Sequence, residues 1–114
     1  MNDFTRETIS IIKTIPEGKV ITYGLVAELA GAPRAARQVS RILHSLSRKY
    51  DLPWHRVINS KGIISLKSIE GKENQKWLLE QEGIKVSDCY EIDLNKYLWN
   101  LESTDFENLE KSDI

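Results

Sequence analysis

A pattern of two helices fills residues 22–47, whose sequence is TYGLVAELAGAPRAARQVSRILHSLS. Thr22 is suited to cap the first helix, which we expect to run through Ala30, because a threonine hydroxyl can accept a hydrogen bond from a free backbone N–H. Gly-Ala-Pro at 31–33 ends that helix. A second helix is then expected over residues 34–47. Two helices joined by a short turn that contains glycine form the helix-turn-helix pattern.

The second of these helices separates its apolar and basic residues onto different faces. At roughly 100° per residue, one face carries the apolar side chains that we expect to point inward, namely Ala35, Ala36, Val39, Ile42, Leu43 and Leu46. The opposite face carries the arginines, which are Arg34, Arg37, Arg41 and, if the helix extends far enough, Arg48. A line of arginines opposite the core is where a DNA-binding helix carries its contacts.

Further helical segments are expected on either side of this pattern. Apolar residues at helical spacing predict a helix over residues 4–15, which ends before a Pro-Glu-Gly turn. Another helix is expected over residues 73–82, and residues 93–99 form a last ordered segment. We expect Trp77 and Trp99, which lie in these two segments, to belong to the core.

The sequence also predicts a small β-hairpin. Residues 57–58 and 63–65 are apolar and flank a turn in which Gly62 supplies a positive φ. A hairpin that follows a helix-turn-helix is a wing, so the expected fold class is a mainly α winged helix-turn-helix domain. We place this domain at residues 1–99 and an acidic tail at residues 100–114.

Charge is distributed unevenly along a chain of 114 residues whose net charge is only −1. Residues 34–76 hold ten basic and three acidic residues, a net charge of +7, whereas the segment after Trp99 holds five acidic residues and one lysine. A basic segment on a near-neutral chain indicates a polyanionic partner, although a solvated basic face explains the charge equally well. The length and the 40% share of hydrophobic residues are typical of one globular domain.

Several classes of protein are disfavoured by features that the sequence lacks. No apolar run is long enough for a transmembrane helix, and the N-terminus is not of the signal-peptide type. Cys89 is the only cysteine, which favours a reducing, intracellular compartment. We expect a cytoplasmic, DNA-associated protein. Together with the two histidines, His44 and His55, this cysteine offers no zinc-binding spacing, and there is no glycine-rich phosphate loop. We therefore expect neither a metal nor a cofactor.

Four short motifs occur along the chain. They are Ile-Pro-Glu-Gly-Lys-Val at 15–20, Thr-Tyr-Gly at 22–24, Ala-Arg-Gln-Val at 36–39 and Pro-Trp-His-Arg-Val-Ile at 53–58. In this order they resemble the DNA-binding domain of O6-alkylguanine-DNA alkyltransferases, whose signature is Pro-Cys-His-Arg-Val. Here Trp54 stands in place of the cysteine. That replacement, the short chain and the ending Tyr97-Leu98-Trp99 resemble the alkyltransferase-like proteins.

The resemblance implies a function and a set of functional residues. Alkyltransferase-like proteins bind O6-alkylguanine in double-stranded DNA through the minor groove and turn the damaged base out of the helix. By resemblance, Tyr23 presses on the phosphate beside that base, and Arg37 fills the gap left in the base stack. The expected lesion pocket consists of Tyr23, Trp54, Val57 and Lys67. The expected DNA-binding set consists of Tyr23, Arg34, Arg37, Ser40, Arg41 and Lys61.

A third set of residues matches the catalytic machinery of the true alkyltransferases. His55 and Glu82 correspond to the pair that helps to ionise the cysteine there, and we expect them to remain as a vestigial network, with Arg56 in a structural role. Two positions depart from the enzymes' pattern. The enzymes carry an asparagine in the turn after the recognition helix, where this chain has Leu-Ser-Arg at 46–48, and Lys67 stands where some relatives have arginine.

Without a thiol in the acceptor position, alkyl transfer is not expected. Transfer from guanine O6 requires a soft nucleophile such as a thiolate. The indole of Trp54 has no suitable lone pair, and we expect Cys89 to be an inert thiol. The resemblance therefore implies a monomeric protein that marks the lesion for nucleotide excision repair proteins. Two alternatives stay open: an enzyme that acts on alkylated guanine through His55 and Glu82, and a sequence-specific transcription factor.

Overall fold

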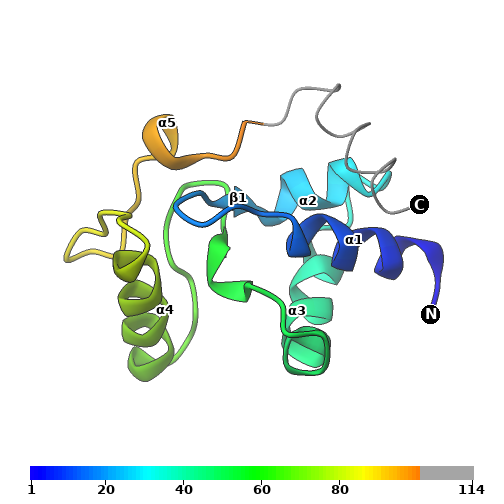
Figure 1. Cartoon of the computed structure of the whole chain (residues 1–114), viewed down its shortest axis with the longest axis horizontal. Helices are drawn as coiled ribbons and strands as arrows, with labels where there is room; N and C mark the ends of the chain where they lie inside the picture. The colour runs from blue at the N-terminus through cyan, green and yellow to red at the C-terminus, as the bar shows by residue number, and fades with distance from the viewer. Residues whose placement is uncertain (101–114) are drawn as a thin grey trace.

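The chain folds into five α-helices, a short 3-10 helix and two short strands, in a computed structural model that describes residues 1–100 (Figure 1). In chain order the elements are α1 (Asp3–Lys13), β1 (Ile21–Thr22), α2 (Tyr23–Leu29), α3 (Ala36–Tyr50), η1 (Trp54–Arg56), β2 (Val57–Ile58), α4 (Ile69–Gln81) and α5 (Leu94–Tyr97). Apart from Asn100, the expected acidic tail lies outside the described residues. None of the described helices is long and apolar enough to cross a membrane.

Four helices begin at a side chain that caps their first turn; in the short α5 this side chain is Asp93, which accepts a hydrogen bond from the N–H of Asn95. Asn2 caps α1, Thr22 caps α2 and Ser68 caps α4, each by accepting a hydrogen bond from the backbone N–H three residues later. The first N–H groups of a helix have no partner within it, so a cap of this kind stabilises the helix by about 1 kcal/mol. The cap expected at Thr22 is confirmed. Gly83, with a φ of +83°, follows the end of α4.

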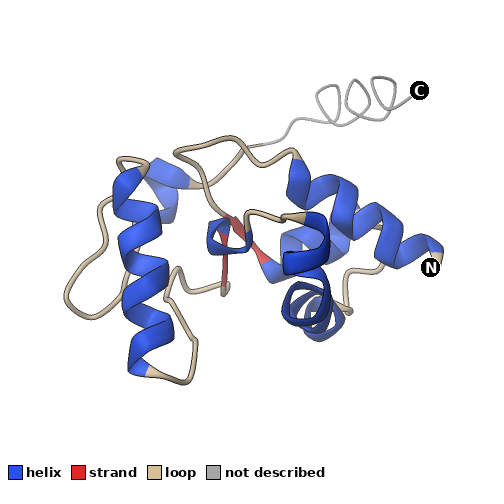
Figure 2. Ribbon diagram, turned by 60° about the horizontal axis from the view of Figure 1, so that its bottom comes forward, coloured by secondary structure: helices blue, strands red, loops and turns tan. Residues whose placement is uncertain are grey.

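The core consists of two clusters of apolar side chains on either side of the two strands. The first cluster lies among α1, α2 and α3 and includes Ile12, Val26 and Val39. The second includes Leu79 of α4 and Ile84 in the segment after it. Figure 1 shows α4 on one side of the molecule and α1 to α3 on the other, and Figure 2 shows the strands between them.

The two strands join these clusters. They pair in parallel, with Ile21 beside Val57 and Thr22 beside Ile58. Val57 belongs to the first cluster and Ile58 to the second, because successive side chains of a strand point to opposite sides. The segment that carries Trp54 therefore leads directly into the centre of the molecule.

The β-hairpin expected within residues 57–65 does not form. The turn itself is present, and Gly62 has the positive φ that was expected, +76°. The residues after the turn pair with a later segment, because the N–H of Ile64 donates to the carbonyl of Tyr90 and that of Ile92 to the carbonyl of Gly62. A Cβ at Gly62 would lie 2.7 Å from the carbonyl oxygen of Ile92, so this approach requires glycine. The turn at Gly62 depends only on neighbouring residues and does not select the partner of β2. Pairing with the distant strand β1 is favoured because both residues of β2 are then buried.

The helix-turn-helix is present as α2 and α3, with shifted ends. α3 begins two residues later and ends three residues later than expected, so Arg34 precedes it and Arg48 lies within it. Residues 46–48, where the turn was expected, are therefore helical. The chain leaves the helix at Asp51, whose φ of +50° lies in the left-handed region. Aspartate and asparagine adopt this conformation more readily than most residues.

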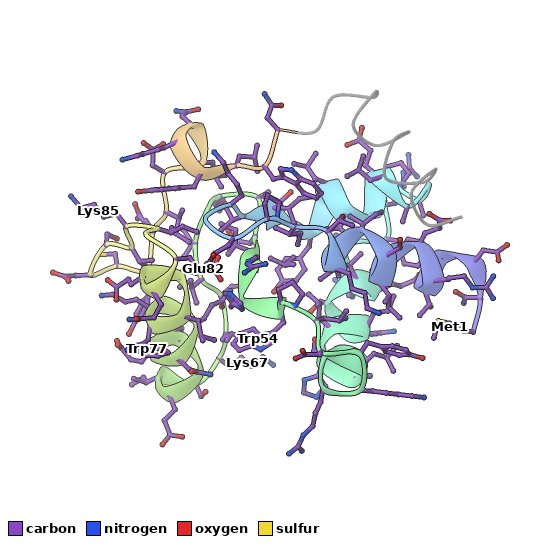
Figure 3. The ribbon with its side chains drawn as sticks, in the orientation of Figure 1. Met1, Trp54, Lys67, Trp77, Glu82 and Lys85 are labelled. Carbon is purple, nitrogen blue, oxygen red and sulfur yellow. The ribbon has the colours of Figure 1, made fainter. Side chains whose placement is uncertain are left out.

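Trp77 is exposed rather than in the core, with 58% of its surface accessible (Figure 3). The buried residues of α4 are Gln75 and Leu79. A residue two positions from Gln75 lies about 200° around the helix, so Trp77 points away from the core. Trp99, in contrast, packs against the first cluster as expected.

Candidate nucleic-acid interface

Three arginines near the start of α3 form an exposed cationic surface. Arg34, Arg37 and Arg41 are exposed, and they line a broad hollow of about 750 Å³ together with Ala32, Pro33, Ala35 and Gln38. Within residues 1–100, none of the three arginines takes part in an ion pair. Their charges are therefore available to a polyanion.

A second pocket, of about 500 Å³, lies between α3 and the loop that follows it. Tyr23, Ser40 and Trp54, which the sequence assigned to the lesion pocket or the DNA-binding set, line it together. The other lining residues are Leu43, His44, Ser47, Arg48, Asp51, Leu52 and Leu66. Sequence reasoning missed this second group as pocket residues. Their signal is helical periodicity, because extending the face of Ser40 along α3 identifies most of them.

Trp54 is held at this pocket by its own backbone. The N–H of Trp54 donates to the carbonyl of Leu52 over 2.8 Å, and the N–H of Leu52 donates to the carbonyl of Ser47 over 2.9 Å. The bond to Ser47 joins the loop to α3, and the bond from Trp54 fixes the turn within the loop. The half-buried indole meets the ring of His55 edge-on, with ring centroids 6.2 Å apart. A rigid, partly exposed aromatic face beside a pocket suits contact with a nucleic-acid base.

Tyr23 begins α2 and is half-buried at the same pocket. Burial raises the pKa of its phenol above the ordinary value of 10.0. The hydroxyl therefore stays protonated at neutral pH and can donate a hydrogen bond to an anion. This chemistry is compatible with the phosphate contact that the resemblance implied.

The carboxylate of Glu82 connects segments that are far apart in the sequence. Nε of Arg56 donates to its Oε1 over 2.9 Å and Nη2 donates to its Oε2 over 2.9 Å. Nε2 of His55 pairs with Oε2, and the N–H of Gly18 donates to Oε1 over 2.9 Å. Nη1 of Arg56 donates to the carbonyl of Ile15 over 2.8 Å. The contact between His55 and Glu82 is present, whereas the partners Gly18 and Ile15 were missed.

Glu82 remains ionised within this network. Burial by itself raises the pKa of the carboxyl group, but hydrogen bonds from Arg56, from the N–H of Gly18 and from His55 outweigh it and lower the pKa below the ordinary value of 4.5. Neither Glu82 nor His55 lines the pocket at Trp54. The network is therefore suited to hold the backbone of η1 in place and poorly suited to deliver a proton to a bound base.

Val57, Lys67 and Lys61 line neither this pocket nor the hollow at the arginines. Val57 has no exposed surface and packs in the first cluster, so the expectation that it lines the pocket is wrong. Lys67 is exposed and follows Leu66, which does line the pocket, and Figure 3 shows Lys67 near Trp54 between α3 and α4. Lys61 is exposed in the turn that ends at Gly62.

The chain is similar to known proteins. Residues 3–84 match the family model of the 6-O-methylguanine DNA methyltransferase DNA-binding domain. The chain is 48% identical over 99 residues to the DNA base-flipping protein of Escherichia coli strain K12, and the match covers 87% of this chain and 76% of that protein. It is 39% identical over 104 residues to alkyltransferase-like protein 1 of Schizosaccharomyces pombe, with 87% and 96% covered.

The fold also matches a solved structure. The crystal structure of S. pombe Atl1 in complex with damaged DNA containing O6-carboxymethylguanine superposes with a TM-score of 0.80 at 39% identity, covering 89% of this chain and 98% of that chain. The mainly helical helix-turn-helix class is thereby confirmed. The chain belongs to the family of the 6-O-methylguanine DNA methyltransferase DNA-binding domain and, within it, to the alkyltransferase-like proteins.

Proposed function

We propose that this protein binds O6-alkylguanine in duplex DNA and turns the damaged base into the pocket at Trp54 without accepting the alkyl group. The observation that supports the proposal most directly is that α3 contributes side chains both to the cationic surface and to the pocket. One stretch of this helix presents Arg37 and Arg41 to solvent, and the adjoining face lines a pocket with Tyr23 and Trp54. A cationic surface binds the DNA backbone, and an adjoining pocket has room for an extruded base.

Each residue has a role in this proposal. Tyr23 contacts the phosphate beside the damaged nucleotide, and Arg37 enters the gap left by the extruded base. Trp54 contacts the base and the group on O6. Lys67 lies at the edge of the pocket and adds a positive charge there. The remaining contacts to the DNA backbone come from the exposed residues Arg34, Ser40, Arg41 and Lys61.

The absence of a thiol at the pocket supports binding without alkyl transfer. Accepting an alkyl group from O6 requires a nucleophile such as a thiolate. None of the ten residues that line the pocket is a cysteine. Cys89 is exposed in the segment after α4, and its N–H bonds to Ser87. The complex therefore persists, and a persistent, monomeric protein at the lesion marks it for nucleotide excision repair proteins.

The two alternative functions have less support. An enzyme that activates water through His55 and Glu82 needs an available base at the reacting group. Both oxygens of Glu82 are already hydrogen-bonded, and neither residue lines the pocket. A sequence-specific transcription factor would use the arginines of α3 without any need for the pocket. It would also prefer one undamaged sequence over others, which a selection from random duplexes measures.

Titration of matched oligonucleotides that contain guanine or O6-methylguanine tests the proposal. Contact between an aromatic face and a base contributes about 1–3 kcal/mol. Trp54→Ala is therefore expected to weaken binding to the damaged duplex by about tenfold or more, which corresponds to about 1.4 kcal/mol, and to leave binding to undamaged duplex nearly unchanged. Trp77→Ala is the matched control, because Trp77 is an exposed tryptophan outside the pocket.

The same samples test for alkyl transfer. After incubation with excess O6-methylguanine duplex, the intact mass of the protein is expected to be unchanged. A gain of one methyl group would overturn the non-enzymatic part of the proposal. Retention of the full preference for damage by Trp54→Ala would show that the lesion is bound elsewhere.

A further inference from the structure

The pocket at Trp54 extends along α3 as a groove. Its lining residues from this helix are Ser40, Leu43, His44, Ser47 and Arg48. Their spacing of three and four residues places them on one face, which rises about 1.5 Å per residue. The groove therefore runs from the turn next to Arg37, where DNA is proposed to bind, toward the last turn of the helix.

The chemistry of the groove changes along this direction. Tyr23, Leu43, Leu52, Trp54 and Leu66 supply aromatic and aliphatic surface. The end near the last turn of α3 carries polar residues, which are His44, Ser47, Arg48 and Asp51.

Among the residues that the structure describes, three of these polar side chains, those of His44, Arg48 and Asp51, have no hydrogen-bond or ion-pair partner. The hydroxyl of Ser47 is already used, because it donates to the carbonyl of Leu43 within the helix. The guanidinium of Arg48 and the carboxylate of Asp51 are both exposed, and neither has a side-chain hydrogen bond or ion pair among the residues that the structure describes. At this end Arg48 therefore offers a donor and Asp51 an acceptor, three residues apart, with the imidazole of His44 one turn before Arg48.

This end lies close to Trp54. The backbone of Leu52 bonds to that of Ser47, and the backbone of Trp54 bonds in turn to that of Leu52, over 2.9 and 2.8 Å. A chain of a few atoms on the O6 of a base held against Trp54 is therefore long enough to approach Arg48 and Asp51.

We infer that Arg48 and Asp51 form a subsite for the far end of the O6 substituent, and that the protein prefers adducts that end in a hydroxyl group over hydrocarbon adducts of the same length. This inference rests on the proposed function. A hydroxyl group both accepts and donates hydrogen bonds, so Arg48 donates to its oxygen while its O–H donates to the carboxylate of Asp51. A terminal methyl group satisfies neither side chain and displaces water from both.

The subsite favours a neutral hydroxyl group over a carboxylate. A carboxylate gains from Arg48, but it meets the negative charge of Asp51. It also meets the partial negative charge at the carbonyl end of α3. The class of ligand assigned to the subsite is therefore the hydroxyalkyl adduct of guanine O6.

Competition titrations with duplexes that differ only at O6 test the inference. The adducts are methyl, butyl and hydroxypropyl, the last two having the same number of heavy atoms. The wild-type protein is expected to bind the hydroxypropyl duplex about fivefold more tightly than the butyl duplex. The ratio is modest because both charged partners of the hydroxyl group are exposed to water, which weakens the net gain from their hydrogen bonds.

Two variants remove the donor and the acceptor without disturbing the fold. Arg48→Met keeps an unbranched side chain on the exposed surface of α3. Asp51→Gly places glycine at a residue with a φ of +50°, where glycine has no steric penalty. Each variant is expected to bring the ratio of hydroxypropyl to butyl affinity to about twofold or less. Arg41→Met is the control, because Arg41 lies on α3 outside this groove and should weaken binding to all duplexes alike.

The outcomes separate the inference from the proposed function. Equal affinity of the wild-type protein for the hydroxypropyl and butyl duplexes overturns the subsite, even when O6-methylguanine is preferred over guanine. A uniform loss with Arg48→Met, equal for every adduct and for undamaged duplex, assigns Arg48 to the DNA backbone and also overturns it. Absence of any preference for methylated over normal guanine refutes the proposed function itself.

Discussion

Glu82 connects three segments of the chain that are distant in sequence. Its carboxylate binds the loop before β1 through Gly18 and binds η1 through His55 and Arg56. Only 7% of its side-chain surface is exposed. Removing one partner of a nearly buried ion pair leaves the other charge without compensation, which costs far more than breaking an exposed pair.

Glu82→Gln is expected to lower the free energy of unfolding at pH 7 by about 2–3 kcal/mol. Because the pKa of Glu82 is lower in the folded protein than its ordinary value of 4.5, its contribution is complete above that value and is lost as the pH falls through the lower folded value. The stability difference between wild type and Glu82→Gln should therefore shrink below about pH 4.5. Urea unfolding at pH 7 and in acid measures it, with the exposed neighbour Glu80→Gln as control. A constant difference across this range would show that ionised Glu82 does not stabilise the fold.

At the scale of the element, α3 combines three tasks on one helix. Val39 and Leu43 are buried in the first core cluster. Arg37 and Arg41 lie one turn apart on the exposed surface, and a third face lines the pocket. An α-helix suits this combination because its side chains project in all directions around the axis at fixed spacing.

Arg37→Ala is expected to impair extrusion of the base more than the initial contact with DNA. Extrusion costs a few kcal/mol in lost stacking and pairing, and a side chain in the gap replaces part of that stacking. A fluorescent base analogue at the target position should brighten less with Arg37→Ala than with wild type at saturating protein. Arg41→Ala, one turn away, should lower affinity without changing the brightness of the saturated complex. Brightening of Arg37→Ala to the wild-type level would remove Arg37 from this role.

At the scale of the whole molecule, the uneven distribution of charge is expected to guide the approach to DNA. The chain has a net charge of only −1, yet residues 34–76 carry a net charge of +7. The exposed arginines before and within α3 and the exposed lysines of the following loop belong to this basic segment. Cations that neutralise DNA phosphates release condensed counterions, so binding through this surface depends on salt.

Affinity for undamaged duplex is expected to fall with salt, with a log–log slope of roughly −4 to −5 for about four to six phosphate contacts. Neutralising Lys61 or Arg34 should reduce the magnitude of the slope by about one each, and should affect damaged and undamaged DNA similarly. Fluorescence anisotropy at several salt concentrations measures both. A slope near zero would refute the assignment of this surface to DNA.

Much of the architecture follows from local patterns in the sequence. The helices, the cap at Thr22, the end of α4 before Gly83 and the basic face of α3 all depend on contacts within a few residues. The candidate site is harder to predict from local sequence patterns. Tyr23 and Trp54 were identified through a resemblance of motifs, whereas Arg48 and Asp51 reach the same pocket only because α3 continues to Tyr50.

The sequence by itself determined the approximate positions of the α-helices and which face of α3 is basic, because capping, turn chemistry and helical periodicity act between near neighbours. It did not predict the first turn of α4 or the 3-10 helix η1. Only the tertiary structure decided that β2 pairs with β1, that Trp77 faces solvent and that Val57 is in the core behind the pocket residues. The turn at Gly62 forms in either arrangement, so it does not select the partner of β2. That choice depends on how much apolar surface two distant segments bury together, and this quantity exists only once the chain has folded.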